Sequence, residues 1–434
     1  MFWWLYNLVF VIGFALLVPH YLWRMCRRGG YARDFAQRFG RYSVDIRERL
    51  GARRRLWIHA VSVGEVYVAL KFMAAYRETQ PDVAFVLTTN TSTGHRIAHA
   101  RLHGDDVLLY FPVDLPIFVN RVLDAINPTA LVLTECELWP NLVRLADGRG
   151  IPLALLNGRV SDSSYRGYRF CARLFRNLLT RFAVVLVQGD RDGERIRALG
   201  ALPERVHVLG TAKYDVATQD SSKMELLRGI LDAAGIPQEA PLIAAGSTWP
   251  GEERVLVEVY QALRESVEGL KLVLVPRHFE RAAEVERELK ALGVNYVKRS
   301  TLTPGAPCAK PADVLLLDST GELVGVYAHA SLIFVGKSLG KHHGGQNIIE
   351  PALFGKPVLF GPNMENFPVV VQDFLAADAA IQVADPAALE ARMRTLFLDP
   401  AMGAALGQRA AAIVVAKRGC LARSVELIMA CQDR

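Results

Sequence analysis

The sequence has few cysteines, and none of them forms a C-x-x-C pair. Six scattered cysteines argue against a disulfide scaffold or a zinc ribbon and are typical of a reducing compartment. The chain also lacks a fixed-period repeat, a low-complexity tract and a second long apolar run, so a polytopic membrane protein is excluded. Because 51% of its 434 residues are hydrophobic and 22% are charged, a disordered or collagen-like chain is excluded as well.

The one long apolar run stands at the start of the chain. Residues 1–23 contain no Asp, Glu, Lys or Arg, and aromatic residues stand near both ends of the run. Its length is about enough to cross a ~30 Å hydrocarbon core. A cleaved signal peptide fits poorly, because no charge precedes the run and no small-residue cleavage site follows it. We therefore predict a membrane anchor over residues 1–23 that spans the bilayer or lies in its interface; a helix buried in a soluble core is the alternative.

A basic segment follows this run. Residues 24–55 hold eleven arginines, no lysine and three acids, so they carry +8, whereas the whole chain carries +7. The positive-inside rule then places the bulk of the chain in the cytoplasm. The arginines can also attract anionic lipid headgroups, although a plain stop-transfer flank is an open alternative. We do not expect nucleic acid as a partner, because the segment adjoins the apolar run and lacks interleaved aromatic residues.

Short apolar runs alternate with helical stretches after residue 55. The predicted strands are Leu56–Val61, Val83–Thr88, Ala130–Leu133, Pro152–Leu156, Ala183–Gln188, Leu242–Ala245, Leu272–Val275, Val314–Leu317, Leu332–Val335 and Pro357–Phe360. Continuous apolar strands are typical of parallel sheets that are buried on both faces, and the helices between them imply βαβ units.

The predicted strands fall into two series. We predict two doubly wound α/β domains over residues 56–215 and 225–415, a polar linker over 216–224, and a C-terminal helix over 416–434 that packs back toward the first domain. In such sheets ligands bind beyond the carboxyl ends of the strands. The cleft between the domains is therefore the expected site.

Two motifs of the first domain each allow a structural and a functional interpretation. In H59-A-V-S-V-G-E65, the spacing of Ser62 and Glu65 is that of a capping box, yet Glu65 at a strand's carboxyl end is also placed to act as a general base. A glutamate that folds back to cap a helix is a poor base. The motif T88-T-N-T-S-T-G94 suits an anion at a helix start or an ordinary Ser/Thr cap.

Two further motifs place charge after strands of the first domain. T134-E-C-E-L-W-P140 sets two acids two positions apart at a sheet rim, unless one of them caps the next helix. G210-T-A-K-Y-D215 contains a lone lysine among apolar residues, and a solvated lysine is the alternative to a functional one.

The second domain carries residues suited to a nucleotide. Arg277 in V275-P-R-H278 stands just past a strand, where it can meet a phosphate or carboxylate. D318-S-T-G-E-L323 follows another strand. The glycine turn of G344-G-Q-N-I-I-E350 lets backbone amides approach a phosphate, and Glu350 can accept hydrogen bonds from a ribose, although a lone glycine-rich turn often binds nothing.

We expect no metal ion and no other cofactor. D190-R-D192 has the D-x-D form used by metal-dependent transferases, but acids at a helix start explain it. His342 and His343 are adjacent, which does not by itself create convergent ligands.

Taken together and in this order, the motifs resemble the 3-deoxy-D-manno-octulosonic acid (Kdo) transferases of lipopolysaccharide biosynthesis, glycosyltransferase family 30. The matching stretches are HAVSVGE, TTNTSTG, YFPVDLP, ECELWPN, LVPRH, TGEL and GGQNIIEPALFGKPVLFGP. The resemblance implies a GT-B fold, in which two Rossmann-like domains face each other across a cleft. It also implies metal-independent, inverting transfer of Kdo from CMP-Kdo to the lipid A precursor (lipid IVA), at the cytoplasmic side of the cell inner membrane and near its anionic lipids.

The resemblance also implies roles for single residues. Glu65 matches the general base, and Glu135 and Lys213 match positions that stabilise the transition state. The positions that match CMP contacts are Pro276, Arg277, Thr320, Gly321, Glu322, Asn347, Ile348, Ile349 and Glu350. Lys337 departs from the family by standing where a glycine is common. A sugar-nucleotide epimerase of similar two-domain architecture is the alternative function, and the motifs do not predict how many Kdo units are added.

Overall fold

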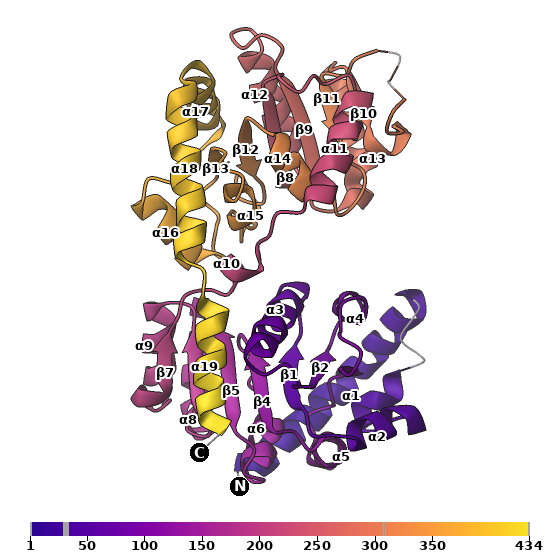
Figure 1. Cartoon of the computed structure of the whole chain (residues 1–434), viewed down its shortest axis with the longest axis vertical. Coiled ribbons are helices and arrows are strands. Elements are labelled where there is room, and N and C mark those ends of the chain that lie inside the picture. The colour runs from indigo at the N-terminus through magenta and orange to yellow at the C-terminus, as the bar shows by residue number, and fades with distance from the viewer. Residues whose placement is uncertain (1, 29–33, 307, 309, 433–434) are drawn as a thin grey trace. The chain divides into compact units, whose positions relative to one another are not determined.

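The computed structural model describes residues 2–28, 34–306, 308 and 310–432, and it leaves the side chains of residues 2 and 18–28 undescribed. The chain divides into two units (Figure 1). The first unit holds residues 1–216 and 419–434, and the second holds residues 217–418. The second unit is therefore an insertion within the sequence of the first.

A parallel sheet of seven strands forms the centre of the first unit. Its strands are β1 (Leu56–Ala60), β2 (Phe85–Thr89), β3 (Val107–Tyr110), β4 (Ala130–Thr134), β5 (Leu153–Gly158), β6 (Val184–Val187) and β7 (Val206–Val208). Their spatial order is β3-β2-β1-β4-β5-β6-β7, so the direction of winding reverses between β1 and β4. That reversal is the position at which doubly wound sheets bind ligands, beyond the carboxyl ends of the strands.

Helices cover both faces of this sheet. They are α1 (Phe2–Arg28), α2 (Val44–Gly51), α3 (Val63–Thr79), α4 (Ser92–His99), α5 (Pro116–Ile126), α6 (Pro140–Asp147), α7 (Asp162–Phe170), α8 (Ala172–Leu179), α9 (Asp190–Ala198), α10 (Lys213–Val216) and α19 (Cys420–Gln432), with short 3-10 turns at Phe35–Phe39 and Pro203–Arg205. Successive strand residues belong to opposite cores: Trp57 packs with residues of α5 and α6, and Ile58 packs with residues of α3 and α19. The C-terminal helix thus completes one of the two cores.

The second unit repeats the architecture with a second parallel sheet. Its strands are β8 (Leu242–Thr248), β9 (Lys271–Pro276), β10 (Tyr296–Lys298), β11 (Val314–Leu316), β12 (Leu332–Val335), β13 (Val358–Phe360) and β14 (Ile381–Gln382), in the order β10-β11-β9-β8-β12-β13-β14. Its helices are α11 (Ser221–Ala233), α12 (Glu252–Leu263), α13 (Ala282–Ala291), α14 (Leu323–His329), α15 (Ile349–Ala352), α16 (Pro368–Ala376), α17 (Pro386–Leu398) and α18 (Pro400–Ala416), with 3-10 turns at Phe279–Arg281 and Arg299–Thr301.

The predicted α/β class with two parallel, doubly wound sheets is confirmed, and all ten predicted strands are present. The four strands that the sequence did not predict are β3, β7, β10 and β14, which are the two edge strands of each sheet. Three of them are only two or three residues long and are partly exposed. An edge strand has one neighbour and needs no continuous apolar run, so the signal that identified the central strands is weak there.

The N-terminal helix α1 is bound to the first unit by polar side chains. Tyr6 Oη donates to Asp114 Oδ2 at 2.8 Å, Asn141 Nδ2 donates to Asn7 Oδ1 at 2.7 Å, and Trp3 packs against the core. Among the residues that the structure describes, none of the helices combines the length and apolar character needed to cross a membrane. The predicted anchor over residues 1–23 is therefore not confirmed, and its side chains from residue 18 onward lie outside the described residues.

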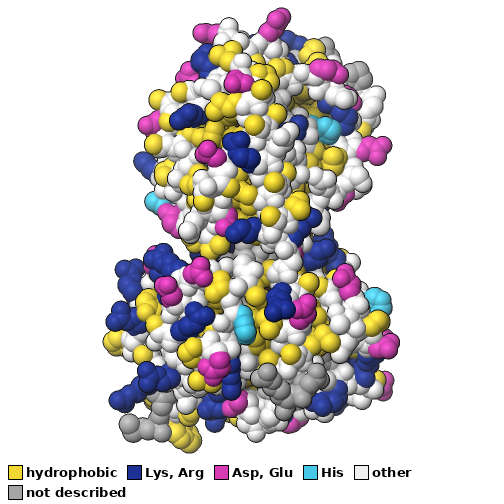
Figure 2. Space-filling model, turned by 60° about the vertical axis from the view of Figure 1, so that its left-hand side comes forward, with side chains coloured by type: hydrophobic (Ala, Val, Ile, Leu, Met, Phe, Trp, Pro, Cys, Tyr) yellow, Lys and Arg dark blue, Asp and Glu magenta, His cyan; other side chains and the backbone are white. Residues whose placement is uncertain are grey.

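Several arginines of the predicted basic segment bind the first unit itself. Arg49 donates to the carbonyls of Gly104 and Asp106, and Arg54 donates to the carbonyls of Asn127 and Pro128. Arg55 is buried and donates to the Leu50 carbonyl. On the face of the first unit in Figure 2, Lys and Arg side chains (dark blue) are scattered among apolar ones. Part of this positive charge therefore stabilises loops.

Candidate active site

Glu65 lies at the carboxyl end of β1 and closes a capping box on α3. Ser62 Oγ accepts from Glu65 N at 3.3 Å, and Glu65 Oε1 accepts from Ser62 N at 3.1 Å. Glu65 Oε2 accepts from Val61 N at 3.0 Å and from Thr134 Oγ1 at 2.8 Å. The structural interpretation of this motif is thus realised, and the residue is only 6% exposed. The carboxylate is nevertheless held at the ends of β1 and β4, where the winding reverses.

Glu135 follows β4 in a strained backbone conformation. Its φ is +51°, a left-handed conformation that non-glycine residues rarely adopt and that often occurs at functional sites. Burial raises the pKa of its carboxyl group; the charge of Glu65 adds to this, and Lys213 opposes it. Glu135 therefore shares one electrostatic environment with both of the other predicted catalytic residues.

Lys213 stands at the start of the short helix α10 and is half-buried, not solvated. Burial lowers the pKa of its ammonium group, and the neighbouring charge of Glu135 opposes that shift. The structure thus brings Glu65, Glu135 and Lys213 together. An ammonium group beside the Glu135 carboxylate can stabilise negative charge that develops nearby.

Glu137, the second acid of the T134-E-C-E motif, and His59 are neighbours of this cluster to which the sequence assigned no role. Burial, followed by the charge of Glu65, raises the pKa of the Glu137 carboxyl group to about 7. Its Oε2 accepts from Trp139 Nε1 at 2.9 Å and lies 3.9 Å from His59 Nε2. His59 is fully buried and stacks on Phe111, and burial lowers its pKa to about 3, so its ring is neutral. The signal for Glu137 was its place two residues after Glu135.

Neither acid of the T134-E-C-E motif caps helix α6. Asp114 does so from the loop after β3, because its two carboxylate oxygens accept from Asn141 N at 3.0 Å and Leu142 N at 2.9 Å. Burial raises the pKa of Asp114 to about 6. In T88-T-N-T-S-T-G94, Thr91 Oγ1 accepts from Gly94 N, so this motif forms the ordinary helix cap of α4.

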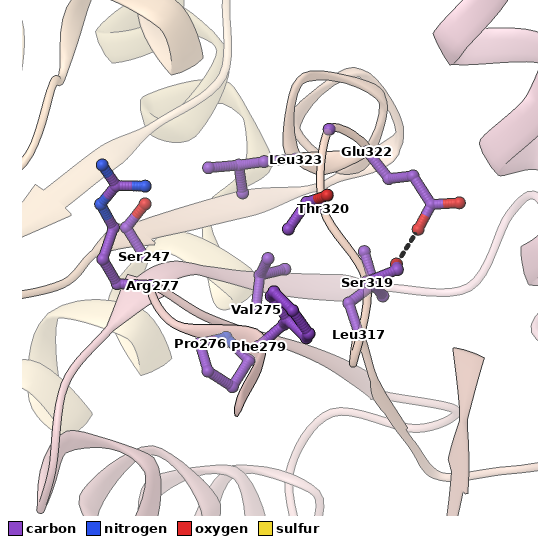
Figure 3. A pocket seen from close by; sticks show the side chains of 11 residues that line it. Ser247, Val275, Pro276, Arg277, Phe279, Leu317, Ser319, Thr320, Glu322 and Leu323 are labelled. Atoms are coloured by element: carbon purple, nitrogen blue, oxygen red, sulfur yellow. Dashed lines mark hydrogen bonds between the residues drawn. The ribbon is translucent and has the colours of Figure 1, made fainter. Parts of the chain in front are cut away.

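A pocket opens in the second unit beyond the carboxyl ends of β8, β9 and β11. Its lining contains Ser247, Val275, Pro276, Arg277, Phe279, Leu317, Ser319, Thr320, Gly321, Glu322 and Leu323. Its empty volume, which includes open solvent, is about 430 Å³. Figure 3 shows Arg277 and Ser247 at one side and Ser319 with Glu322 at the other. Five of the predicted nucleotide contacts, Pro276, Arg277, Thr320, Gly321 and Glu322, thus share one pocket.

Glu322 is fixed within this pocket by two donors. Arg299 Nε donates to its Oε1 at 2.8 Å, and Ser319 Oγ donates to its Oε2. Its carboxylate therefore has a set orientation before any ligand binds. Neither Arg299 nor Ser319 was selected from the sequence, because their link to Glu322 depends on the fold.

The residues of the N347-I-I-E350 segment do not line this pocket. Ile348 and Ile349 are fully buried core residues, so only their backbones are available to a ligand. Asn347 Nδ2 donates to Glu350 Oε1 at 3.2 Å. Burial raises the pKa of Glu350, while Asn347 and the charge of Arg277 oppose that shift, so Glu350 is linked to the pocket by electrostatics.

The D-x-D sequence serves the fold of the first unit. Asp190 and Asp192 stand in the first turn of α9, and Asp192 Oδ1 accepts from Val160 N at 2.8 Å. His343 Nδ1 pairs with Glu365, whereas the His342 ring packs against Trp249. Within the described ranges, no three His, Cys, Asp or Glu side chains are grouped as metal ligands would be.

Comparison with known proteins agrees with this arrangement. The sequence model of the 3-deoxy-D-manno-octulosonic-acid transferase (kdotransferase) family matches residues 33–216. The chain is 34% identical to the 3-deoxy-D-manno-octulosonic acid transferase of Bordetella pertussis, with 96% of each chain covered. It is 32% identical to the enzyme of the same name from Haemophilus influenzae, covering 92% of this chain and 91% of the relative.

Two solved structures share the fold at low sequence identity. Anabaena HepE in complex with UDP has a TM-score of 0.59 at 15% identity, covering 87% of this chain and 100% of that one. The UDP-GlcNAc 2-epimerase of Neisseria meningitidis has a TM-score of 0.56 at 13% identity, covering 84% and 99%. These likenesses, with the two doubly wound units, confirm a GT-B type of α/β fold and carry no information on activity. The identity to named transferases over nearly the whole length, by contrast, shows that this chain is a glycosyltransferase and belongs to the Kdo transferase family.

Proposed function

We propose that the chain transfers Kdo from CMP-Kdo to the lipid A precursor lipid IVA, with inversion at the anomeric carbon. The observation that carries this proposal is the cluster of Glu65, Glu135 and Lys213 at the winding reversal of the first sheet. It occurs in a chain that is 34% identical to a named Kdo transferase over nearly its whole length. Membership of the family supports glycosyl transfer of Kdo, and the identities of the donor and the acceptor are the finer part of the proposal.

Glu65 takes the proton from the attacking hydroxyl group. A sugar hydroxyl is a poor nucleophile, and a positioned carboxylate typically accelerates such a step by about 10²–10⁴-fold. The bonds from Val61, Ser62 and Thr134 keep the carboxylate in one orientation. Of these donors only Ser62 N binds Oε1, so that oxygen retains a lone pair for the substrate proton. The capping bonds weaken Glu65 as a base, but they fix its orientation and leave this one acceptor position open.

Lys213 and Glu135 shape the electrostatic environment of the reaction. The hydroxyl oxygen forms a bond to the anomeric carbon while the bond from that carbon to the phosphate of CMP breaks, so negative charge moves to the phosphate. The half-buried ammonium group of Lys213 stabilises that charge in a site where water screens it weakly. Glu135 opposes the effect of burial on the pKa of Lys213 and so favours the protonated form of the lysine.

The pocket of the second unit holds the CMP moiety. Arg277 provides a planar cation for the phosphate, and the Thr320 hydroxyl group is a further donor. The Glu322 carboxylate, held by Arg299 and Ser319, accepts hydrogen bonds from ribose hydroxyls. These cations and donors supply the charge stabilisation, so we expect transfer to continue without a metal ion.

The helix α1 places the enzyme on its lipid substrate. One side of the helix is bound to the first unit through Trp3, Tyr6 and Asn7. The other side exposes the apolar residues Leu5, Leu8, Val9, Ile12 and Leu16, whose spacing puts them on one helix face. Tyr6 and Asn7, near the start of α1, are hydrogen-bonded to Asp114 and Asn141 of the first unit. We therefore favour a helix that lies in the membrane interface over one that spans the bilayer. Exposed arginines such as Arg41 and Arg47 would meet anionic headgroups at the cytoplasmic side of the inner membrane.

Mass spectrometry of the lipid product tests the proposal. The full chain is incubated with CMP-Kdo and lipid IVA, with and without EDTA, and we expect lipid IVA that is heavier by one or more Kdo units in both arms. Glu65→Gln should reduce the rate by about 10²–10⁴-fold, because the amide cannot take a proton, although its single oxygen can still accept the capping-box bond from Ser62 N. The affinity for CMP, measured by calorimetry, should not change.

Two outcomes would contradict this function. One is the absence of any Kdo-bearing lipid in the wild-type reaction. The other is epimerisation of UDP-N-acetylglucosamine by the same preparation in the absence of lipid, which would favour the epimerase alternative. If Glu65→Gln retained the wild-type rate, Glu65 would not be the general base, and the proposed transfer of Kdo would be unaffected.

A further inference from the structure

We propose that Lys337, together with the indole N–H of Trp249, binds the carboxylate of the donor sugar and so selects a sugar acid over a neutral sugar. This inference rests on the proposed function, because it concerns the same donor. It assigns a residue outside the lining of the pocket in the second unit. The carboxylate subsite lies at the Arg277 end of that pocket.

The backbone at Lys337 is held in a conformation that L-residues rarely adopt. Lys337 follows β12 and Gly336, and its φ is +57°. Its N–H donates to Glu252 Oε2 at 2.8 Å, while the N–H groups of Ser338 and Leu339 donate to Glu252 Oε1 at 3.0 Å each. The buried Glu252 carboxylate therefore fixes this turn. Strained non-glycine residues that the surrounding structure holds in place are concentrated at ligand sites.

The side chain of Lys337 lies over an aromatic ring whose own polar atom lacks a partner. Lys337 Nζ is 4.6 Å from the centroid of the Trp249 ring. Trp249 Nε1 is buried and has no hydrogen-bond partner among the described residues. An indole nitrogen can only donate, and a buried donor without an acceptor is costly. The missing partner is therefore an acceptor, and beside an ammonium group an anionic acceptor fits best.

The carboxylates of the surrounding loops are bound by other groups. Glu252 accepts four backbone N–H bonds, from Trp249 and from residues 337–339. Glu365 accepts from His343 Nδ1 at 2.9 Å and from Gly344 N at 2.7 Å. Within the part of the chain that the structure describes, Lys337 Nζ forms no ion pair, and its one electrostatic contact is with the Trp249 ring. Its charge is thus available to a ligand.

Lys337 and Trp249 adjoin the nucleotide pocket. Ser247, which lines the pocket, is two residues from Trp249 and also has a positive φ, of +56°. Arg277 N donates to Thr248 O at 3.0 Å, and the ring of His278 packs edge-on against Trp249 at 5.5 Å. The backbone at Arg277 and the ring of His278 therefore lie next to the Ser247–Trp249 segment, whose indole ring Lys337 contacts.

The chemistry of the donor favours a second site for an anion next to the phosphate, and Lys337 makes that site cationic in this chain. In a CMP-linked 2-keto sugar acid, the anomeric carbon bears both the phosphate and a carboxylate, so two anions lie side by side. Arg277 accounts for the first of them. Lys337 with Trp249 Nε1 provides a charged and a neutral donor for the second, whereas a neutral sugar would leave both donors unpaired. A site built for such a pairing discriminates strongly against ligands that lack it.

Calorimetric titration of the full chain with CMP and with CMP-Kdo, in the absence of acceptor, tests the inference. Lys337→Met should weaken CMP-Kdo binding by about tenfold or more, since a charge-assisted bond is lost, and change CMP binding by less than about twofold. Lys337→Arg should retain most of the preference for CMP-Kdo. Trp249→Phe, which keeps a ring and removes the N–H, should weaken CMP-Kdo selectively but less. Lys341→Met, at an exposed position in the same loop, is the matched control and should bind both ligands as wild type does.

The outcomes separate this inference from the proposed function. Equal weakening of CMP and CMP-Kdo by Lys337→Met would show that Lys337 serves the nucleotide or the fold, and no weakening would show that it serves neither ligand. Either result overturns the inference while the wild-type lipid product still supports transfer. If wild type binds CMP-Kdo no more tightly than CMP, the carboxylate subsite is refuted directly. The proposed function itself is tested by the separate product assay, in which its failure would appear as the absence of any Kdo-bearing lipid.

Discussion

At the residue scale, the first unit holds several buried or half-buried acids. Glu65, Glu135 and Glu137 lie close enough for their charges to affect one another, and Asp114 is buried beneath α1. Two of these groups have pKa values near neutrality: about 7 for Glu137 and about 6 for Asp114. A fold that raises the pKa of a carboxyl group must lose stability as the solution pH rises, because ionisation then occurs in an environment that opposes it.

We predict this loss for Glu137. Between the unfolded pKa near 4.5 and the folded pKa near 7, the native state binds more protons than the unfolded state does, so the free energy of unfolding falls as pH rises. Glu137→Gln removes that dependence. The variant should match wild type at pH 4.5 and exceed it by roughly 1–2 kcal/mol at pH 8, as measured by urea unfolding. A difference between the two proteins that is the same at every pH would show that the ionisation of Glu137 is not its cause.

At the element scale, α1 packs one side against the first unit and exposes apolar residues on the other side. Its inner side contributes Trp3, Tyr6 and Asn7 to the first unit, and burial raises the pKa of Tyr6 beside Asp114. Its outer side presents Leu8, which is 58% exposed, and Leu16, which is 75% exposed. The polar contacts set which side faces outward, and they do not depend on a membrane.

Replacing both Leu8 and Leu16 with Ser should therefore weaken binding to vesicles. Each leucine buried in an apolar phase contributes about 1.5–3 kcal/mol, so we expect at least a tenfold loss of affinity in flotation with anionic phospholipid vesicles. Thermal unfolding should stay within about 1 °C of wild type, because both side chains are exposed in the folded chain. The matched control is Leu398→Ser, which removes a leucine that is 65% exposed in the second unit. Equal flotation of both variants would refute the role of α1.

The elements also show what sequence patterns can predict. Every strand with two neighbours was predicted, because burial on both faces requires a continuous apolar run. Glu65, Glu135 and Arg277 were found because each follows such a strand, and Lys213 because it is a lone charge among apolar residues. Asp114 was missed as a cap, since it caps a helix that begins 26 residues later and no local spacing marks that contact. The burial of Ile348 and Ile349 and the bond from Arg299 to Glu322 likewise depend on distant segments.

At the scale of the whole molecule, the C-terminal helix α19 belongs to the unit formed by the first half of the chain. Leu421, Val425 and Ile428 are buried in the core that α3 and β6 share. Asp215 binds the start of this helix, since its carboxylate accepts from Gly419 N at 2.7 Å and Leu421 N at 2.8 Å. In Figure 1, α19 (yellow) lies against the strands of the first unit.

This arrangement predicts that the two units respond to different perturbations. Val425→Ala should lower the stability of the first unit by about 1–3 kcal/mol, through the lost apolar contact and the cavity left behind. CMP at 100 times its Kd should raise the free energy of unfolding of the second unit by about 2.7 kcal/mol. Differential scanning calorimetry should show two unfolding transitions. Val425→Ala should lower the temperature of one of them, and CMP should raise the temperature of the other. Glu426→Ala, on the exposed side of α19, is the control. If CMP shifted the same transition that Val425→Ala lowers, α19 and the CMP site would not belong to separately unfolding units.

The return of α19 to the first unit has a consequence for synthesis on the ribosome. Once residue 216 has emerged, about 200 further residues must be translated before Leu421 and Val425 exist. At 5–20 residues per second that delay is roughly 10–40 s. During that delay, the apolar residues of α3 and β6 that α19 covers in the folded protein are exposed on the nascent chain. Chaperones that shield such surfaces therefore have a defined target, and premature termination before residue 419 yields a fragment whose N-terminal lobe is prone to aggregate.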